Sequence, residues 1–178
     1  MARTTSLAAG VITALLVLSG CAAASNTSSD NGKEPTLVQT KSPVQLLRND
    51  ATDRVDKSIV SDIRKTTDAS TPCFNEEDNP GGLIRQWKSS AELVLVGGSD
   101  RDGATTQLVQ SFVDQGWESE QVSDDSTFGL TLLTSDSSVA SIEISSADFS
   151  AVAIIRITAT GPCVTTAGPD SDEVKGLE

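Results

Sequence analysis

The sequence predicts an α+β fold, in which a mainly antiparallel sheet of about four to six strands carries two helices on one face as a two-layer sandwich. Two stretches with apolar residues at helical spacing precede a series of short alternating segments. Turns rich in Asp and Ser separate these segments, as in a meander of antiparallel strands. A length of 178 residues accommodates one such domain once non-structural ends are set aside.

The first residues, 1–20, are expected to form a signal peptide. Their apolar stretch, residues 7–18, is shorter than the roughly 20 residues of a membrane-spanning helix and matches the roughly 7–15 residues of a signal-peptide core. It ends in LSGC at residues 18–21, which resembles the lipobox of bacterial lipoproteins. This resemblance implies that the Cys21 thiol carries diacylglycerol, into which labelled palmitate can be incorporated. It also implies that the signal peptide is cleaved directly before Cys21. The alternative is a soluble secreted protein that is cut after a nearby Ala-x-Ala-like site.

Residues 21–41 are expected to comprise the lipidated Cys21 and a flexible tether, because residues 22–41 are small, polar and without periodicity. As a random coil this tether spans roughly 25 Å, which holds a domain away from a membrane without fixing its orientation. Residues 42–164 are assigned to a single α+β domain. The acidic residues 165–178 are expected to form a disordered tail.

The domain is predicted to begin with an amphipathic helix over residues 43–65. Ser42 suits the N-cap of this helix, and Pro43 suits its first position. Apolar residues then recur at the spacing of one helix face: Val44, Leu47, Ala51, Val55, Ile59 and Ile63. We expect this face to pack on the sheet, while a role in binding a partner is the alternative. Residues 66–82 are expected to form a loop.

Residues 83–96 are predicted to be extended, as one long bent strand or as two short strands. A second helix is expected over residues 104–117. Gly116 suits the left-handed residue that ends a helix, and such a cap would fold Trp117 back onto Phe112.

Four further strands are predicted over residues 118–122, 127–133, 139–145 and 150–160. Two of them alternate apolar with polar or small residues, which is typical of a strand with one covered and one wet face. The apolar positions are Phe128, Leu130 and Leu132 in one strand, and Ala140, Ile142 and Ile144 in the other. The last strand is apolar at nearly every position from 151 to 157, which predicts a central strand.

With Cys21 assigned to the lipid, Cys73 and Cys163 remain as a pair. An exported chain meets oxidising conditions, so we expect a disulfide between them. A metal pair or a redox couple is the alternative. Both are disfavoured, because the chain has no His to complete a zinc site and the two cysteines do not form a C-x-x-C motif.

The composition excludes several function classes. Lys and Arg total 13 against 25 Asp and Glu, for a formal charge of −12, so the chain lacks the basic face that a nucleic-acid partner requires. The absence of His excludes Ser-His-Asp and Cys-His catalysis and the common zinc sites. The acidic run at 75–79 is expected to be a solvated loop, and the Asp-containing segment at 99–106 lacks the remaining ligands of a calcium loop. We therefore expect neither a metal nor a cofactor.

Three residues are candidates for a binding surface. Arg156 interrupts the most apolar strand, where it would either pair with a neighbour such as Glu143 or help to form an anion-binding or protein-binding surface on the uncovered side of the sheet. Arg85 and Trp87 are the other two candidates, and they form a cationic and aromatic group on the extended segment predicted over residues 83–96. No catalytic residue is assigned, and enzymatic activity is left open.

The lipobox, the helix ending in QGW and the closing segment ATGPCV together resemble the small, mostly uncharacterised lipoproteins of actinobacteria. In many of these a helix ends in GW and a closing strand ends in Pro-Cys. The resemblance implies a lipid-anchored protein on the extracytoplasmic face of the cell membrane, with a disulfide-linked α+β domain. We expect a binding or accessory module of the cell envelope, whose partner is an envelope protein or a small ligand. The alternatives are an envelope hydrolase that uses carboxylates and a purely structural, self-associating domain.

Overall fold

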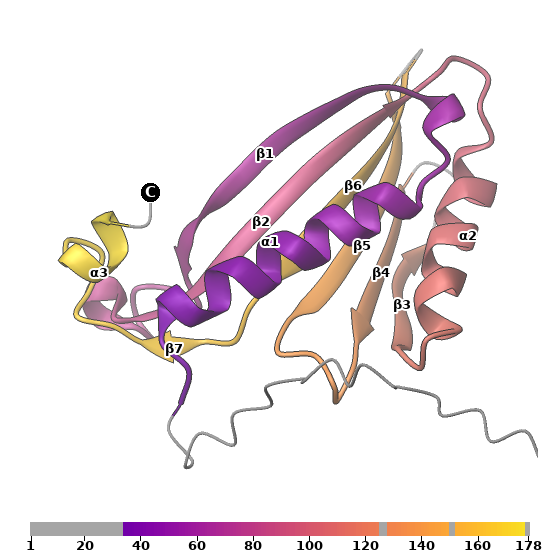
Figure 1. Cartoon of the computed structure of the whole chain (residues 1–178). Helices are drawn as coiled ribbons and strands as arrows, with labels where there is room; N and C mark the ends of the chain where they lie inside the picture. Colours follow the sequence, from indigo (N-terminus) through magenta and orange to yellow (C-terminus); the bar gives the residue numbers. More distant parts are fainter. Residues whose placement is uncertain (1–33, 125–127, 150–151, 177–178) are drawn as a thin grey trace, which may run out of the picture. The chain divides into compact units, whose positions relative to one another are not determined.

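The computed structural model describes residues 34–124, 128–149 and 152–176 (Figure 1). The predicted signal peptide and Cys21 lie outside these described residues. The helices are α1 (Leu37–Arg54), α2 (Arg101–Val113) and α3 (Asp172–Lys175), with the short 3-10 helices η1 (Lys57–Ile59) and η2 (Pro80–Gly82). The strands are β1 (Val60–Pro72), β2 (Ile84–Leu95), β3 (Glu118–Asp124), β4 (Phe128–Thr134), β5 (Ser141–Phe149), β6 (Val152–Thr160) and β7 (Val164–Thr165). No helix among the described residues is long and apolar enough to cross a membrane.

All strands belong to one sheet, in the order β1–β2–β6–β5–β4–β3, with the short β7 paired to one end of β2 (Figure 1). Every pairing is antiparallel. This confirms the α+β class and the mainly antiparallel sheet. The main path has six strands, and β7 is one strand more than predicted. Strand β6 lies between β2 and β5, so the central position predicted from its apolar run is confirmed.

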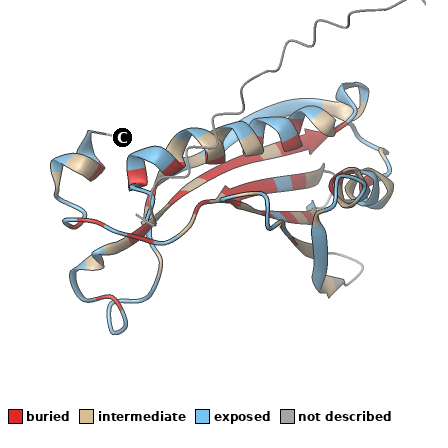
Figure 2. Ribbon diagram, turned by 60° about the horizontal axis from the view of Figure 1, so that its bottom comes forward, coloured by how far each residue is buried: buried red, intermediate tan, exposed pale blue. Residues whose placement is uncertain are grey.

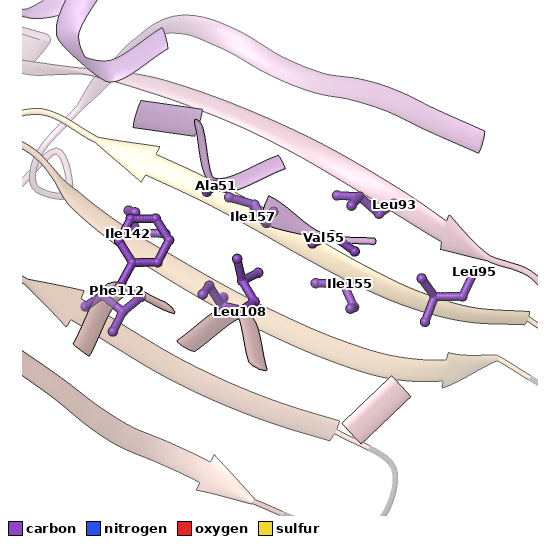
Figure 3. Close-up of a cluster of buried hydrophobic side chains, with 11 residues drawn as sticks. Ala51, Val55, Leu93, Leu95, Leu108, Phe112, Ile142, Ile155 and Ile157 are labelled. Carbon is purple, nitrogen blue, oxygen red and sulfur yellow. The ribbon is translucent and has the colours of Figure 1, made fainter. Parts of the chain in front are cut away.

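One side of the sheet, which we call the core face, contributes to a cluster of buried apolar side chains (Figure 3). Residues directly opposite each other in a sheet point to the same side, and the opposed pairs Leu93–Ile155 and Ile144–Ile157 both belong to this cluster. The helices add Ala51 and Val55 from α1, and Leu108 and Phe112 from α2. We call the opposite side of the sheet the outer face. Buried residues line the strands and the helix sides that pack on them (Figure 2).

Helix α1 begins earlier and ends earlier than the predicted helix over residues 43–65. Thr36 and Gln39 form a capping box: the Thr36 hydroxyl accepts a hydrogen bond from the Gln39 N–H, and the Gln39 side chain accepts one from the Thr36 N–H. This cap lies upstream of Ser42, so the helix includes Pro43 in its interior. The last residues of the predicted tether are therefore helical.

Strand β1 occupies residues that the sequence analysis assigned to the helix end and to a loop, so both of those predictions are wrong. Val55 has extended backbone angles and ends α1. The helical spacing of Ile59 and Ile63 is coincidental, because residues 60–72 pair with β2 along nearly its whole length. The segment is rich in β-branched Val, Ile and Thr, which favour strands. Strand β2 itself is one long strand, the first of the two predicted alternatives.

Helix α2 confirms the predicted C-terminal cap, although it starts and ends a few residues earlier than expected. Asp100 is its N-cap, and the carboxylate accepts a hydrogen bond from the Gly103 N–H at 2.9 Å. Gly116 has φ of 88°, in the left-handed region that favours glycine. The Trp117 ring packs edge-on against Phe112 with centroids 5.2 Å apart.

The sulfurs of Cys73 and Cys163 lie 2.09 Å apart, which is the bonded distance that the predicted disulfide requires. Residues 164–176, the described part of the chain beyond this bridge, pack on the domain, whereas the sequence predicted a disordered tail over residues 165–178. Thr166 is buried and its hydroxyl donates a hydrogen bond to the Leu83 carbonyl. Val174 of α3 is buried in a second cluster around Trp87. These buried contacts are why the described part of the tail packs on the domain despite its acidic composition.

Removing the disulfide with Cys73→Ala and Cys163→Ala together should lower the free energy of unfolding by about 2–5 kcal/mol, because a bridge across a separation of 90 residues restrains the unfolded chain. Urea unfolding of the full chain, followed by circular dichroism, measures the change. A reductant should lower the midpoint of the wild type to that of the variant and leave the variant unchanged. Equal midpoints without reductant would contradict a stabilising bridge.

Acid should weaken the connection between α1 and β1 at Asp56. The Asp56 carboxylate accepts a hydrogen bond from the Ser58 N–H at 2.8 Å, and hydrogen bonds from the Ser58 backbone and side chain hold the pKa of Asp56 below its ordinary 3.8. This stabilisation is present above the ordinary pKa and is lost as the pH falls through the lowered pKa. Asp56→Asn should therefore lose less thermal stability than the wild type as the pH falls below about 4. Identical pH profiles of the melting temperature would refute this role.

Candidate functional site

Trp87, one of the predicted surface residues, is fully buried on the core face. Its ring packs in the cluster that contains Val44 and Val174, and its indole N–H donates a hydrogen bond to the Asp68 carboxylate at 3.0 Å. The Lys41 ammonium lies 4.6 Å from the ring centroid. Trp87 is therefore a structural residue, and its prediction as a binding residue is wrong.

Arg85 lies two residues before Trp87 on the same side of β2 and is 7% exposed. Its guanidinium donates two hydrogen bonds to Ser70 of β1, one to the hydroxyl at 2.6 Å and one to the carbonyl at 2.9 Å. These bonds satisfy a buried cation and join the two strands. Arg85 is thus unavailable to a ligand, and the structure does not bring it together with Arg156.

Arg156 lies on the outer face, as the sequence analysis expected, and its side chain is 53% exposed. It forms an ion pair with Glu92, the residue directly opposite on β2, and its Nε donates to the Glu92 carboxylate at 3.1 Å. The predicted partner Glu143 lies instead opposite Thr158. The sequence analysis therefore expected correctly that Arg156 pairs with a carboxylate on an adjacent strand. The carboxylate is that of Glu92 on β2 and not that of Glu143 on β5.

The Glu92–Arg156 pair borders a groove of about 320 Å³ on the outer face. Apolar side chains from three strands form most of its lining: Phe128 of β4, Ala147 and Phe149 of β5, and Ile154 of β6. Ser145, opposite Arg156 on β5, adds a hydroxyl. The groove therefore combines an apolar lining with one ion pair at its border.

Strand β4 turns three of its four large apolar side chains toward the outer face. Leu133 pairs with the buried Ile142 and points to the core face, so Phe128, Leu130 and Leu132 point outward. The outer face thus bears an apolar patch, called the outer patch below, that comprises Phe128, Leu130, Leu132, Ala147, Phe149, Val152 and Ile154. Phe128 is 38% exposed and Phe149 is 60% exposed. The alternation in β4 was visible in the sequence, but the side on which the core lies was not.

A second hollow, of about 510 Å³, lies between α2 and strands β3 to β5. Most of its lining is polar and uncharged, with Thr and Gln side chains from the helix and the strands and Ser146 from β5. Arg101 at its border is 7% exposed and is neutralised by ion pairs with Asp102 at 2.7 Å and Asp148 at 3.0 Å. Water satisfies such polar groups at little cost, so this cleft by itself does not require a ligand.

No family model matches the chain, and neither a curated protein nor a solved structure is similar to it. The chemistry of the two hollows follows from their own side chains. No three acidic, His or Cys residues come together as a metal site within the described parts of the chain. Glu92 is the one carboxylate in the described lining of the outer groove, and Asp102 is the one in the cleft, so neither hollow presents two facing acids. The arrangement suits binding better than acid–base chemistry.

The different roles of Trp87 and Arg156 can be measured as stability. Trp87→Ala should lower the free energy of unfolding by about 3–5 kcal/mol, because it leaves a cavity in a closely packed cluster. Arg156→Ala should cost about 1 kcal/mol or less, because this ion pair is half-exposed and solvent screens it. Urea unfolding of both full-length variants gives the comparison. Equal losses in the free energy of unfolding would contradict the assignment of Trp87 to the buried core and of Arg156 to the exposed face.

Proposed function

We propose that this chain is a lipid-anchored protein on the extracytoplasmic face of the cell membrane and that its domain binds an envelope partner through the outer face of the sheet. The anchor is Cys21, at the end of a short apolar segment and within LSGC. The length of that segment and the position of the cysteine support a processed lipoprotein signal. The domain begins shortly after the polar segment that follows Cys21.

The outer patch is the observation that carries the binding role. Leaving apolar surface in water costs roughly 25 cal/mol per Å², so a patch of neighbouring apolar side chains is normally covered. Here Phe128, Phe149 and Val152 are exposed on adjacent strands. The Glu92–Arg156 pair beside them supplies directional polar groups, which is the usual composition of a binding surface with an apolar centre.

The proposal includes the two-layer arrangement expected from the sequence, with α1 and α2 as one layer on the core face. Its support is that side chains of both helices share one buried cluster with a single side of the sheet. Such an arrangement leaves the outer face free for a partner. No observation favours the alternative of an envelope hydrolase, which needs two carboxylates placed across a cleft.

The anchor predicts that labelled palmitate enters the wild-type chain and that Cys21→Ala abolishes the labelling and releases the protein from washed membranes. The reason is that two or more acyl chains hold a protein durably on a membrane. Equal labelling of both proteins would refute lipidation at Cys21.

The binding role predicts that Phe149→Glu changes the set of crosslinked products formed by the full chain in native membranes, because it places a charge in the outer patch. Phe74→Glu is the matched control, since Phe74 is 51% exposed but lies in the loop between β1 and β2. Crosslinking followed by immunoblotting gives the readout. If neither variant alters the products, the outer face is not the binding surface.

A further inference from the structure

We infer that the outer face binds a second copy of this chain, with the two sheets packed face to face about a two-fold axis parallel to the strands. This inference rests on the proposed use of the outer face. It adds the identity of the partner and the orientation in which the partner binds. It follows from the order of the strands, the apolar positions and the distribution of charge.

The strand order sets which strands meet. The main path has six strands, so its midpoint lies between β6 and β5. A two-fold axis along this midline places β5 of the second copy over β6, β4 over β2, and β3 over β1. It also keeps each residue at its own level along the strands, so that residues at one level of the sheet face each other across the interface.

The apolar residues at one end of the sheet are self-complementary under this rotation, whereas Leu130 meets Glu92 and Leu132 meets Ser90. Phe149 and Val152 are directly opposite within the sheet, so across the axis Phe149 of one copy meets Val152 of the other. One level further along, Ala147 is opposite Ile154 and meets it in the same way. At that same level Phe128 of β4 meets Val94 of β2, because the register joins them through Ala147 and Ile154. A large side chain faces a smaller one in each of these three contacts, as interdigitation requires.

The two halves of the outer face differ in net charge. Residues 102–155, which contain β3, β4 and β5, have no Lys or Arg and nine Asp or Glu. Glu120 and Glu143 point outward in this half. In the other half, β1 and β2 turn Asp62, Arg64, Lys88 and Glu92 outward, and Arg64 is paired with Asp62 at 2.7 Å. Because the rotation places β2 over β4, Lys88 of one copy lies at the level of Thr134 of the other and beside its β3 partner Glu118.

The other in-plane two-fold axis, perpendicular to the strands, gives a poor interface. This axis reverses the direction along the strands, so that at the middle of the sheet it exchanges the two strand ends. It would therefore place the apolar end of the sheet over the end that contains Lys88, Thr160 and Ser141. Desolvation of these polar groups against apolar side chains disfavours that orientation.

Photo-crosslinking in native membranes tests the inference with the full chain. Benzoyl-phenylalanine replaces Phe149 in one variant and Phe74 in the control, so an aromatic ring is retained at both positions. The expected product from position 149 has twice the mass of the chain and contains peptides of this chain alone. A product with a different protein overturns the second copy and leaves the proposed function intact. If position 149 gives no more product than position 74, both the inference and the proposed use of the outer face are wrong.

Charge reversal tests the orientation in the same experiment. Lys88→Glu and Glu118→Lys should each lower the yield of the doubled product by about tenfold, because each brings like charges together across the interface. The double variant should recover most of the yield, since the pairs between copies are then opposite in sign again. Glu77→Lys, in the loop after β1, is the control and should have no effect. Unchanged yields in the single variants, or no recovery in the double variant, would overturn this two-fold arrangement.

Discussion

Both sides of the domain depend on the alternation of side chains along the central strand β6. Ile155 and Ile157 point into the core face and are fully buried, so Arg156 between them has to point to the outer face. Glu92 is directly opposite there and forms the ion pair, while Ile154 points the same way and lines the groove beside it. The backbone pattern that builds the core therefore also places the candidate site. Any shift of β6 by one residue would remove both at once.

The sequence predicted those parts of the fold that local chemistry decides. The cap at Gly116, the contact between Trp117 and Phe112 and the alternating strands of the second half all follow from neighbouring residues. The edge strand β1 could not be predicted in this way. Its side chains are mostly exposed, so they show no apolar alternation, and its extended form depends on pairing with β2, which is distant in sequence. Ile63 completed a helical pattern that this pairing overrides.

The candidate site was predicted in part, and the failures have one cause. A strand can be recognised from its sequence, but the choice of which alternate residues face the core depends on its neighbours. Leu132 and Leu133 are adjacent and similar, so β4 alone fits either side, and only its pairing with β5 assigns Leu133 to the core. The same ambiguity placed Trp87 among the surface residues, whereas Arg156 was assigned correctly because a cation among isoleucines on a central strand has few other places to go.

Lipid anchoring would change how strong a contact through the outer face has to be. Two chains held in one membrane by short tethers meet at an effective concentration far above that of free protein. An interface below the roughly 1,200–2,000 Å² that stable complexes bury can then be occupied.

The formal charge of −12 adds a repulsion that is largely screened beyond about 8 Å at physiological salt. It therefore opposes loose association in every orientation, but it opposes less the one close orientation in which Lys88 of one copy lies beside Glu118 of the other. An acidic chain can in this way retain an exposed apolar patch and still select a single partner geometry.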